Sequence, residues 1–315
     1  MAPEGKPFVI ALEEHYYDSE LAATFDGPEG RAPEIRRRLD DLGELRLKEM
    51  DEAGIDVQVI SHGAPSTQRL DPETAVRLAR NANDRLAQAI AAHPERFAGF
   101  AALPTPDPKA AADELERTVT TLGFKGAMVH GLTRGRFLDE KAFWPIFEAA
   151  QSLDVPIYLH PATPHPDVIA AYYEGYPSMV RVGHGFTGEM SAAAIRLVLS
   201  EVFVTFPRLQ VILGHLGETL PFLLPRVDRY VSREMKGRNF AVGLRQHFYF
   251  TTGGKFTHAA LQCAIEAIGI ERLMFAVDWP FHSNLEGVAF IEKAPIGEDA
   301  KAMIFADNAR RLLRL

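Results

Sequence analysis

The chain has 315 residues, of which 47% are hydrophobic and 24% charged, a balance that is ordinary for a globular enzyme and argues against disorder. No apolar run approaches the ~20 residues that span a bilayer, and the N-terminal segment turns acidic too soon for a signal peptide, so we expect a cytoplasmic protein. The formal charge of −8, without a Lys/Arg stripe, argues against nucleic acid as a partner.

Eight apolar runs alternate with amphipathic segments of helical length, and no linker or repeat interrupts them. Runs that are apolar throughout are typical of parallel strands covered on both faces. We therefore predict an α/β fold, a (β/α)8 TIM barrel with extended βα loops, as one domain over 1–315. The predicted strands are 8–15, 57–62, 97–103, 126–131, 156–161, 209–214, 248–252 and 273–278.

The helices between these strands have recognisable starts, because Asp71 and Asp107 each place a capping side chain before a proline. The predicted helices are 33–53, 72–93, 108–122, 139–153, 188–205, 219–237, 257–268 and 298–313. The single cysteine, Cys263, cannot form an internal disulfide and lies among apolar neighbours, so we expect it in the core rather than as a nucleophile.

Two connections that follow predicted strands are long, 16–32 and 162–187. Long βα loops of a barrel usually shape the substrate pocket. The second loop brings several aromatic residues, and packing within the loop or a contact between subunits would explain them equally well. These residues are Tyr172, Tyr173, Tyr176 and Phe186.

Several predicted strands end in residues that bind metals. Glu13 and His15 end the first strand, and since they are two residues apart they face one side while Glu14 faces the other. His160 ends the fifth strand and Asp278 the eighth. Strand ends converge at the top of a barrel, and this set suits Zn2+ or Mn2+. The alternative for each residue alone is a hydrogen-bonded structural role.

His215 follows the sixth strand, in GHLGE, where glycines permit a tight turn and Glu218 enters the next helix. Glu218 either complements the positive end of that helix or holds His215 in one tautomer so that its other nitrogen acts on substrate. Both roles are compatible.

Three further residues are candidates for the pocket. Arg226 would meet a substrate carboxylate, with a surface ion pair to an acid such as Asp228 as the alternative. His62 and His130 end the second and fourth strands, so they are expected to line the pocket rather than bind the metal.

Six motifs run from the first strand to the last helix: ALEEH at 11–15, FAALPTPDP at 100–108, DVPIYLHP at 154–161, FPRLQVILGHLGETLPFLLPRVD at 206–228, DWPF at 278–281 and NARRLLRL at 308–315. With them the chain resembles the amidohydrolase superfamily, in the branch of aminocarboxymuconate semialdehyde decarboxylase and the aromatic acid decarboxylases. Within that branch it resembles the γ-resorcylate (2,6-dihydroxybenzoate) decarboxylases.

The resemblance implies a role for each candidate. Glu13, His15, His160 and Asp278 map onto the metal ligands. His215 corresponds to a catalytic histidine, Glu218 to its acidic partner and Arg226 to an arginine near the substrate. The fourth strand, GAMVHG, has no lysine to bridge a second metal, which implies a single cation. The resemblance also suggests dimers or tetramers.

The chain departs from the resorcylate pattern at positions expected to face the pocket. It has His130-Gly131 where the family has asparagine-glycine, and Ser61-His62-Gly63 where the family has serine-leucine-asparagine. The RVGHGFTGEM segment lacks a tryptophan expected there. The substrate can therefore differ.

We predict a metal-dependent, non-oxidative decarboxylase of a hydroxylated aromatic acid, without an organic cofactor, in which Asp278 protonates the ring carbon with help from His215. The rival enzymatic hypothesis is metal-dependent hydrolysis of a lactone or amide with Asp278 as base. A rival from another class is a catalytically silent barrel that acts as a binding protein.

Overall fold

The computed structural model describes residues 7–25 and 32–315. Within them every pair of neighbouring strands is parallel, in the orders β1-β2-β3 and β4-β5-β6-β7-β8-β9. The strands are β1 (Ile10–Tyr16), β2 (Val57–His62), β3 (Phe97–Gly99), β4 (Ala101–Ala102), β5 (Ala127–His130), β6 (Ile157–His160), β7 (Val211–Leu213), β8 (Phe248–Thr251) and β9 (Leu273–Met274).

The two sheets are joined at both of their ends. β3 and β4 are the halves of the predicted strand 97–103, separated by Phe100, whose N–H donates to the Ile60 carbonyl of β2 at 2.9 Å. At the other end Leu12 of β1 forms a parallel bridge with Ala276, and its N–H donates to the Phe275 carbonyl at 3.0 Å. The strand order therefore returns to β1, and the predicted α/β fold with parallel strands is confirmed.

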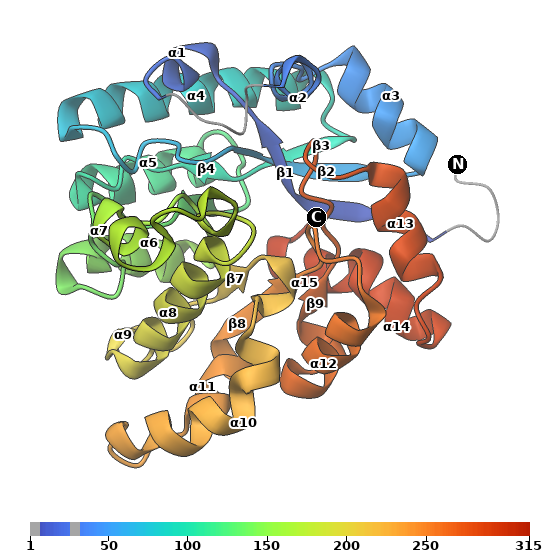
Figure 1. The fold of residues 1–315 in the computed structure, drawn as a ribbon. Helices are drawn as coiled ribbons and strands as arrows, with labels where there is room; N and C mark the ends of the chain where they lie inside the picture. The colour runs from blue at the N-terminus through green and yellow to red at the C-terminus, as the bar shows by residue number, and fades with distance from the viewer. Residues whose placement is uncertain (1–6, 26–31) are drawn as a thin grey trace.

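Helices surround the strands in Figure 1, as the alternating pattern predicts. They are α1 (Ser19–Ala22), α2 (Pro33–Leu39), α3 (Glu44–Ala53), α4 (Pro72–Ala92), α5 (Pro108–Thr120), α6 (Trp144–Leu153), α7 (Pro166–Val168), α8 (Gly185–Leu199), α9 (Val202–Thr205), α10 (Leu220–Val231), α11 (Phe240–His247), α12 (His258–Ile268), α13 (Asn284–Glu292), α14 (Glu298–Ala302) and α15 (Asn308–Leu313). In the described ranges no helix has both the length and the apolar character needed to cross a membrane.

Local side chains set the helix boundaries. The Asp71 and Asp107 carboxylates accept N–H groups of the first turns of α4 and α5, each at 3.0 Å, which confirms the two predicted caps. The predicted helix 33–53 is instead two helices, because the Asp41 carboxylate accepts the N–H groups of Gly43 and Arg46 and starts α3 anew. Helices α1, α7, α11 and α13 lie outside the predicted helices.

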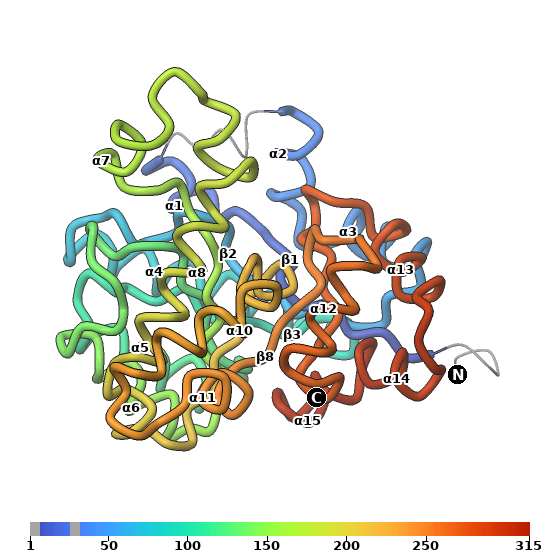
Figure 2. The backbone as a smooth tube through the Cα atoms, turned by 60° about the horizontal axis from the view of Figure 1, so that its bottom comes forward, coloured from blue at the N-terminus to red at the C-terminus, as the bar shows by residue number. Residues whose placement is uncertain are grey.

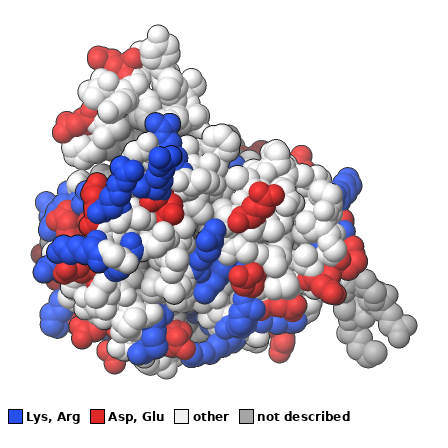
Figure 3. All heavy atoms as spheres, turned by 90° about the horizontal axis from the view of Figure 1, so that it is seen from below, with Lys and Arg blue, Asp and Glu red and all other residues white. Residues whose placement is uncertain are grey.

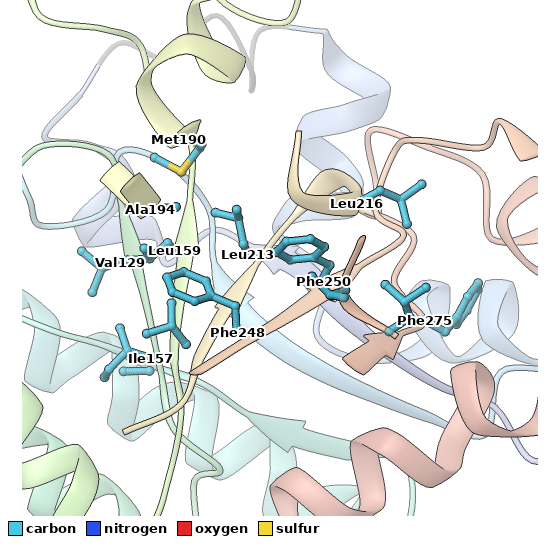
Figure 4. Close-up of a cluster of buried hydrophobic side chains, with 14 of the residues drawn as sticks. Val129, Ile157, Leu159, Met190, Ala194, Leu213, Leu216, Phe248, Phe250 and Phe275 are labelled. Carbon is cyan, nitrogen blue, oxygen red and sulfur yellow. The ribbon is translucent and has the colours of Figure 1, made fainter. Parts of the chain in front are cut away.

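The core has two layers, one on each side of the strands. Alternate residues of β5, β6 and β7 point into the barrel, among them Met128, Tyr158 and Ile212. Their neighbours, Val129 and Leu159 among them, pack outward against α8, as Figure 4 shows. Because both faces of each strand are buried, the strands read as continuous apolar runs.

Cys263 is only half-buried on α12, so the expectation of a core cysteine is wrong. Its neighbours Leu261 and Ala264 are buried, whereas Cys263 lies at the margin of the face that packs on the barrel. The pKa of its thiol is raised by burial, which argues against a reactive thiolate.

The long connection after β6 projects from the barrel. Figure 2 shows the segment around α7 standing above the body on the same side as α2, and Figure 3 shows a protruding lobe with few charged side chains. We call residues 162–184 the α7 lobe. Its exposed apolar side chains include Tyr172, Tyr176 and Val182, which are 76%, 66% and 76% exposed.

Candidate metal centre

Four strand-end side chains meet at one point in the barrel mouth. The Nε2 atoms of His15 and His160 lie 3.2 Å apart. His15 Nε2 lies 3.3 Å from Asp278 Oδ1, and His160 Nε2 lies 3.5 Å from Glu13 Oε1. All four residues are buried, so strands β1 and β6 and the segment after β9 build a polar cluster in an apolar surrounding.

A backbone irregularity in β1 places Glu13. The register between β1 and β2 shifts just before Glu14, and Glu13 has φ 66°, as Asp278 has φ 68°. Non-glycine residues rarely adopt such values, and they concentrate at functional sites. Glu14 points away from the cluster, and its carboxylate accepts the N–H groups of Val277 and Trp279 at 2.9 and 3.1 Å. It thereby fixes both neighbours of Asp278.

The Glu13 carboxylate lies in a fitted cradle. Its Oε2 atom accepts the Tyr158 hydroxyl at 2.5 Å and the Thr251 hydroxyl at 2.9 Å. A Cβ atom at Gly214 or Gly253 would come within 2.6 or 2.2 Å of this carboxylate, so only glycine leaves room for it at those positions. The other oxygen, Oε1, is left to face the cluster.

The donor set fits a divalent cation. Glu13 Oε1 and Asp278 Oδ1 are buried and have no hydrogen-bond partner among the described residues. Burial raises the pKa of Glu13, the nearby His215 lowers it, and the negative charge of Asp278 adds to the rise. The residues form two groups of three possible ligands, and within each group the ligand atoms lie within 4.8 Å of one another. One group is Glu13, His160 and His215, and the other is His15, His160 and Asp278. Imidazole and carboxylate suit Zn2+ and Mn2+ alike.

His15 and His160 are held by hydrogen bonds on the side away from the cluster. His15 Nδ1 lies 3.2 Å from the Ser61 hydroxyl, and His160 Nδ1 donates to the Pro161 carbonyl at 2.8 Å. A carbonyl only accepts, so the His160 proton sits on Nδ1 and its Nε2 lone pair faces the cluster. Such partners orient metal-binding histidines and fix their tautomer.

His215 reaches the same cluster from the turn after β7. Its Nε2 atom lies 3.3 Å from Glu13 Oε1. Burial alone would lower the pKa of His215, but the charges of Glu13, Glu218 and Asp278 raise it to about 9. A cation in the cluster would oppose that rise with its own positive charge. His215 therefore lies beside the cluster, in contact with Glu13.

One hypothesis from the sequence was that Glu218 holds the ring of His215 in one tautomer. In the structure a different group does so. His215 Nδ1 donates to the Gly253 carbonyl at 2.7 Å, and that bond sets the tautomer. The Glu218 carboxylate accepts the Thr187 hydroxyl at 2.7 Å and lies 3.6 Å from Lys255 Nζ. It acts on His215 through charge.

A cavity of about 170 Å³ opens above the cluster. Phe186, from the start of α8, lines it as predicted from its loop, and Phe281 forms another apolar part of the wall. Sequence reasoning gave no role to three titratable lining residues, Arg181, Lys255 and His282. Lys255 and His282 follow the ends of predicted strands, which is the signal that could have identified them. The full lining is His15, Ala64, His160, Arg181, Val182, Phe186, Thr187, His215, Glu218, Gly254, Lys255, Asp278, Phe281 and His282.

Two predicted pocket residues lie behind the cluster instead of on the cavity wall. His62 is buried, its Nδ1 donates to the Gly63 carbonyl at 2.8 Å, and burial lowers its pKa to about 4. His130 is buried against His160, with 3.1 Å between their Nδ1 atoms. Neither side chain lines the cavity of this chain, so a substrate contact by either stays a prediction.

Arg226 is exposed on α10 and is not among the lining residues of the cavity. Arg226 therefore does not contact the cluster in this structure. A contact between Arg226 and the substrate remains a prediction. In the α7 lobe, Tyr173 is buried and its hydroxyl lies 3.0 Å from His184 Nδ1, whereas Tyr172 and Tyr176 face outward.

Comparison with known proteins assigns this architecture to a family. The family model described as Amidohydrolase matches residues 15–315. A gamma-resorcylate decarboxylase from Polaromonas sp. (strain JS666 / ATCC BAA-500) is 38% identical over 321 residues, which cover 97% of this chain and 98% of the relative.

Solved structures agree with this assignment. A dihydroxybenzoic acid decarboxylase from Polaromonas sp. JS666, with bound manganese and the inhibitor 2-nitroresorcinol, has a TM-score of 0.91 at 38% identity, with 98% of each chain covered. A 5-carboxyvanillate decarboxylase from Novosphingobium aromaticivorans DSM 12444, with manganese and 4-hydroxy-3-methoxy-5-nitrobenzoic acid, has a TM-score of 0.94 at 30% identity, with 99% and 97% covered. The chain therefore belongs to the amidohydrolase family, and its relatives there include decarboxylases of hydroxylated aromatic acids, as the resemblance in sequence implies.

Proposed function

We propose that this protein is a metal-dependent, non-oxidative decarboxylase of a hydroxylated aromatic acid of the dihydroxybenzoate type. The observation that carries the proposal is the convergence of Glu13, His15, His160 and Asp278 at the base of a cavity large enough for one substituted ring, with His15, His160 and Asp278 lining that cavity. The relatives named above support it, since they are decarboxylases of such acids and two of the solved structures contain manganese.

Glu13, His15, His160 and Asp278 would hold one Mn2+ or Zn2+ ion. Bound there, the ion would supply Lewis acidity and a template for the carboxylate and the neighbouring hydroxylate of the substrate. No organic cofactor is part of the proposal, because the hydroxylated ring itself takes up and returns the electron pair.

The cavity selects and orients the ring. Its volume of about 170 Å³ compares with the ~150 Å³ of an apolar cavity that accepts benzene. Phe186 and Phe281 supply apolar wall, and the buried cluster supplies the few polar groups that fix orientation. The carboxyl-bearing carbon would lie over Asp278, which lines the floor.

Asp278 in its acid form would donate its proton to the carbon that bears the carboxylate. A C–H bond forms, and electron donation from the ring hydroxylate offsets the loss of aromaticity. The bond to the carboxylate then breaks, its electron pair returns to the ring, and carbon dioxide leaves. Asp278 is left as a carboxylate and regains its proton from water, with His215 Nε2 as the adjacent proton carrier. The negative charges of Glu13, Glu218 and Asp278 raise the pKa of His215 and so favour its protonated form.

We further propose that the protein is a homodimer or homotetramer. Exposed apolar side chains on the α7 lobe and on α10 support this, with Tyr176 66% and Phe222 80% exposed. Light scattering after size-exclusion chromatography measures the mass. The cytoplasmic location expected from the sequence also stays a proposal, which cell fractionation tests.

The test of function is turnover of 2,6-dihydroxybenzoate by Mn2+-loaded protein in D2O. We expect equal amounts of carbon dioxide and resorcinol, with one deuterium on the former carboxyl carbon. The isomer 3,5-dihydroxybenzoate, which lacks an ortho hydroxyl, is the matched control and should not react. Hydrolysis of an aromatic lactone without any release of carbon dioxide would overturn the proposal in favour of a hydrolase.

A further inference from the structure

His130 is a buried histidine to which the proposed reaction gives no role. It ends β5 directly beside His160 at the end of β6, since the two are register partners in the parallel pair. Their rings meet edge to face, with centroids 4.9 Å apart. Among the described residues, two histidines place a ring nitrogen against a ring nitrogen of His160. One is His130, and the other is His15, which lies on the cluster side.

The hydrogen bonds around His130 fix which of its nitrogens carries the proton. Its Nε2 lies 2.7 Å from the main-chain carbonyl of His62. A carbonyl only accepts, so Nε2 carries the proton and donates it. The His130 Nδ1 atom lies 3.1 Å from His160 Nδ1, which carries the proton donated to the Pro161 carbonyl, so a second proton between the two nitrogens has no room and His130 Nδ1 presents a lone pair.

That lone pair faces His160 Nδ1 at 3.1 Å. The same His160 nitrogen donates to the Pro161 carbonyl at 2.8 Å, so its single proton is shared between two acceptors. The opposite tautomer of His160 would put a lone pair against the lone pair of His130 and against a carbonyl oxygen. Both contacts would then be repulsive.

We propose that His130 is a positioning residue for the metal centre: it accepts a share of the His160 Nδ1 proton and so keeps the Nε2 lone pair of His160 directed at the cation. Hydrogen bonds are donated from His160 to His130 and from His130 to the His62 carbonyl. This rests on the proposed metal ligands but not on the identity of the reaction, so a metal-binding assay tests it independently of turnover.

Two substitutions of similar size separate this role from simple packing. His130→Asn places an amide oxygen where Nδ1 lies and keeps the acceptor for His160. His130→Leu fills the space and removes the acceptor. The matched control is His247→Leu, because His247 is also buried and bonded to a carbonyl, that of Leu209 at 3.0 Å, but lies away from the cluster.

The measurements are the dissociation constant for Mn2+, by competition with a chromophoric chelator, and the melting temperature of the metal-free protein. We expect His130→Leu to weaken Mn2+ binding by about 10- to 100-fold, the range for outer partners of ligand histidines. His130→Asn should stay within about threefold of the parent chain, and His247→Leu should lower the melting temperature without changing the dissociation constant.

The visible spectrum of the Co2+-loaded protein gives a readout that packing alone would not move. At saturating Co2+ the ligand-field bands of His130→Leu should shift, and those of His130→Asn should match the parent. Unchanged Mn2+ affinity in a folded His130→Leu protein would overturn the proposal, as would equal losses in His130→Leu and His130→Asn. Failure of the protein to decarboxylate any acid would overturn the proposed function and leave these results intact.

Discussion

The floor and the wall of the cavity are built in opposite ways. The floor is made by strand ends, and its side chains are buried, with Glu13 and His15 fully so. Glu13, His15 and His160 are each held by a hydrogen bond on the side away from the cluster, such as that from Tyr158 to Glu13. The wall is made by loops and the start of α8, and Lys255 on it is 42% exposed in its side chain.

This difference separates chemistry from selectivity. A floor held by the barrel keeps the donor atoms within a fraction of an ångström of their required positions, and metal binding and proton transfer need that accuracy. A wall supplied by loops changes without disturbing the barrel, and so it sets which ring is accepted. Substitutions in the floor should therefore stop the reaction, while substitutions in the wall should alter substrate preference.

Asp278→Asn should have the largest effect. The amide keeps the shape of the side chain but carries no transferable proton, so kcat should fall by at least the 10²- to 10⁴-fold typical of a lost general acid. Turnover is measured with metal content determined on the same sample. A folded, metal-loaded Asp278→Asn protein that decarboxylates at a substantial rate would refute the assignment of the proton donor.

Glu13→Gln should abolish tight metal binding. We expect Mn2+ affinity to fall more than the 10- to 100-fold typical of an outer partner. The metal-free protein should be as stable as the parent or more so, because a buried carboxylate facing Asp278 is replaced by a neutral group. Chelator competition and thermal melting provide the two values, and Mn2+ affinity equal to that of the parent would remove Glu13 from the ligand set.

Glu14→Gln is the matched control one residue along the chain. Here the amide NH2 group would face the N–H group of Val277 or Trp279, so one buried donor would lose its acceptor. The free energy of unfolding should therefore fall by about 1–3 kcal/mol. Chemical denaturation of the metal-free protein measures this. An increase in stability, as expected for Glu13→Gln, would show that Glu14 is not a structural clamp.

Glu189, which lies on α8 and does not line the cavity, should make stability depend on pH. Burial raises the pKa of its carboxyl from 4.5 to about 8, so between these values the folded state binds a proton that the unfolded state lacks. Stability should fall as pH rises through this window, by at most about 1.4 kcal/mol per pH unit. Glu189→Gln should flatten this slope in denaturation curves recorded from pH 5 to 9, and an unchanged slope would contradict the assignment.

Phe186→Ala should have the smallest effect on chemistry, since it changes the wall alone. KM for the preferred acid should rise several-fold to about tenfold, as expected for one lost apolar contact, with kcat changed little. Tyr176→Ala, in the neighbouring α7 lobe, is the control, because Tyr176 is exposed and does not line the cavity. A fall in kcat for Phe186→Ala as large as for Asp278→Asn would erase the distinction between floor and wall.

The sequence was informative where the barrel itself decides position. Apolar runs that end in Glu13, His15, His160 and Asp278 predicted both the parallel strands and the convergence of their ends. The bulge at Glu13 and the carbonyl of Gly253 on His215 could not be predicted, because they depend on backbone placed by distant strands. Likewise, strand-end position predicted that His130 faces the pocket, but its ring turns toward His160 in the neighbouring strand.

A crystal structure of the protein with Mn2+ and 2-nitroresorcinol tests the central claim most directly. We predict one anomalous difference peak within about 2.0–2.3 Å of Glu13 Oε1, His15 Nε2, His160 Nε2 and Asp278 Oδ1. The aromatic ring should lie in the cavity beside Phe186 with its oxygen substituents toward the metal. A peak elsewhere, or a ring bound without metal in the cluster, would contradict the account.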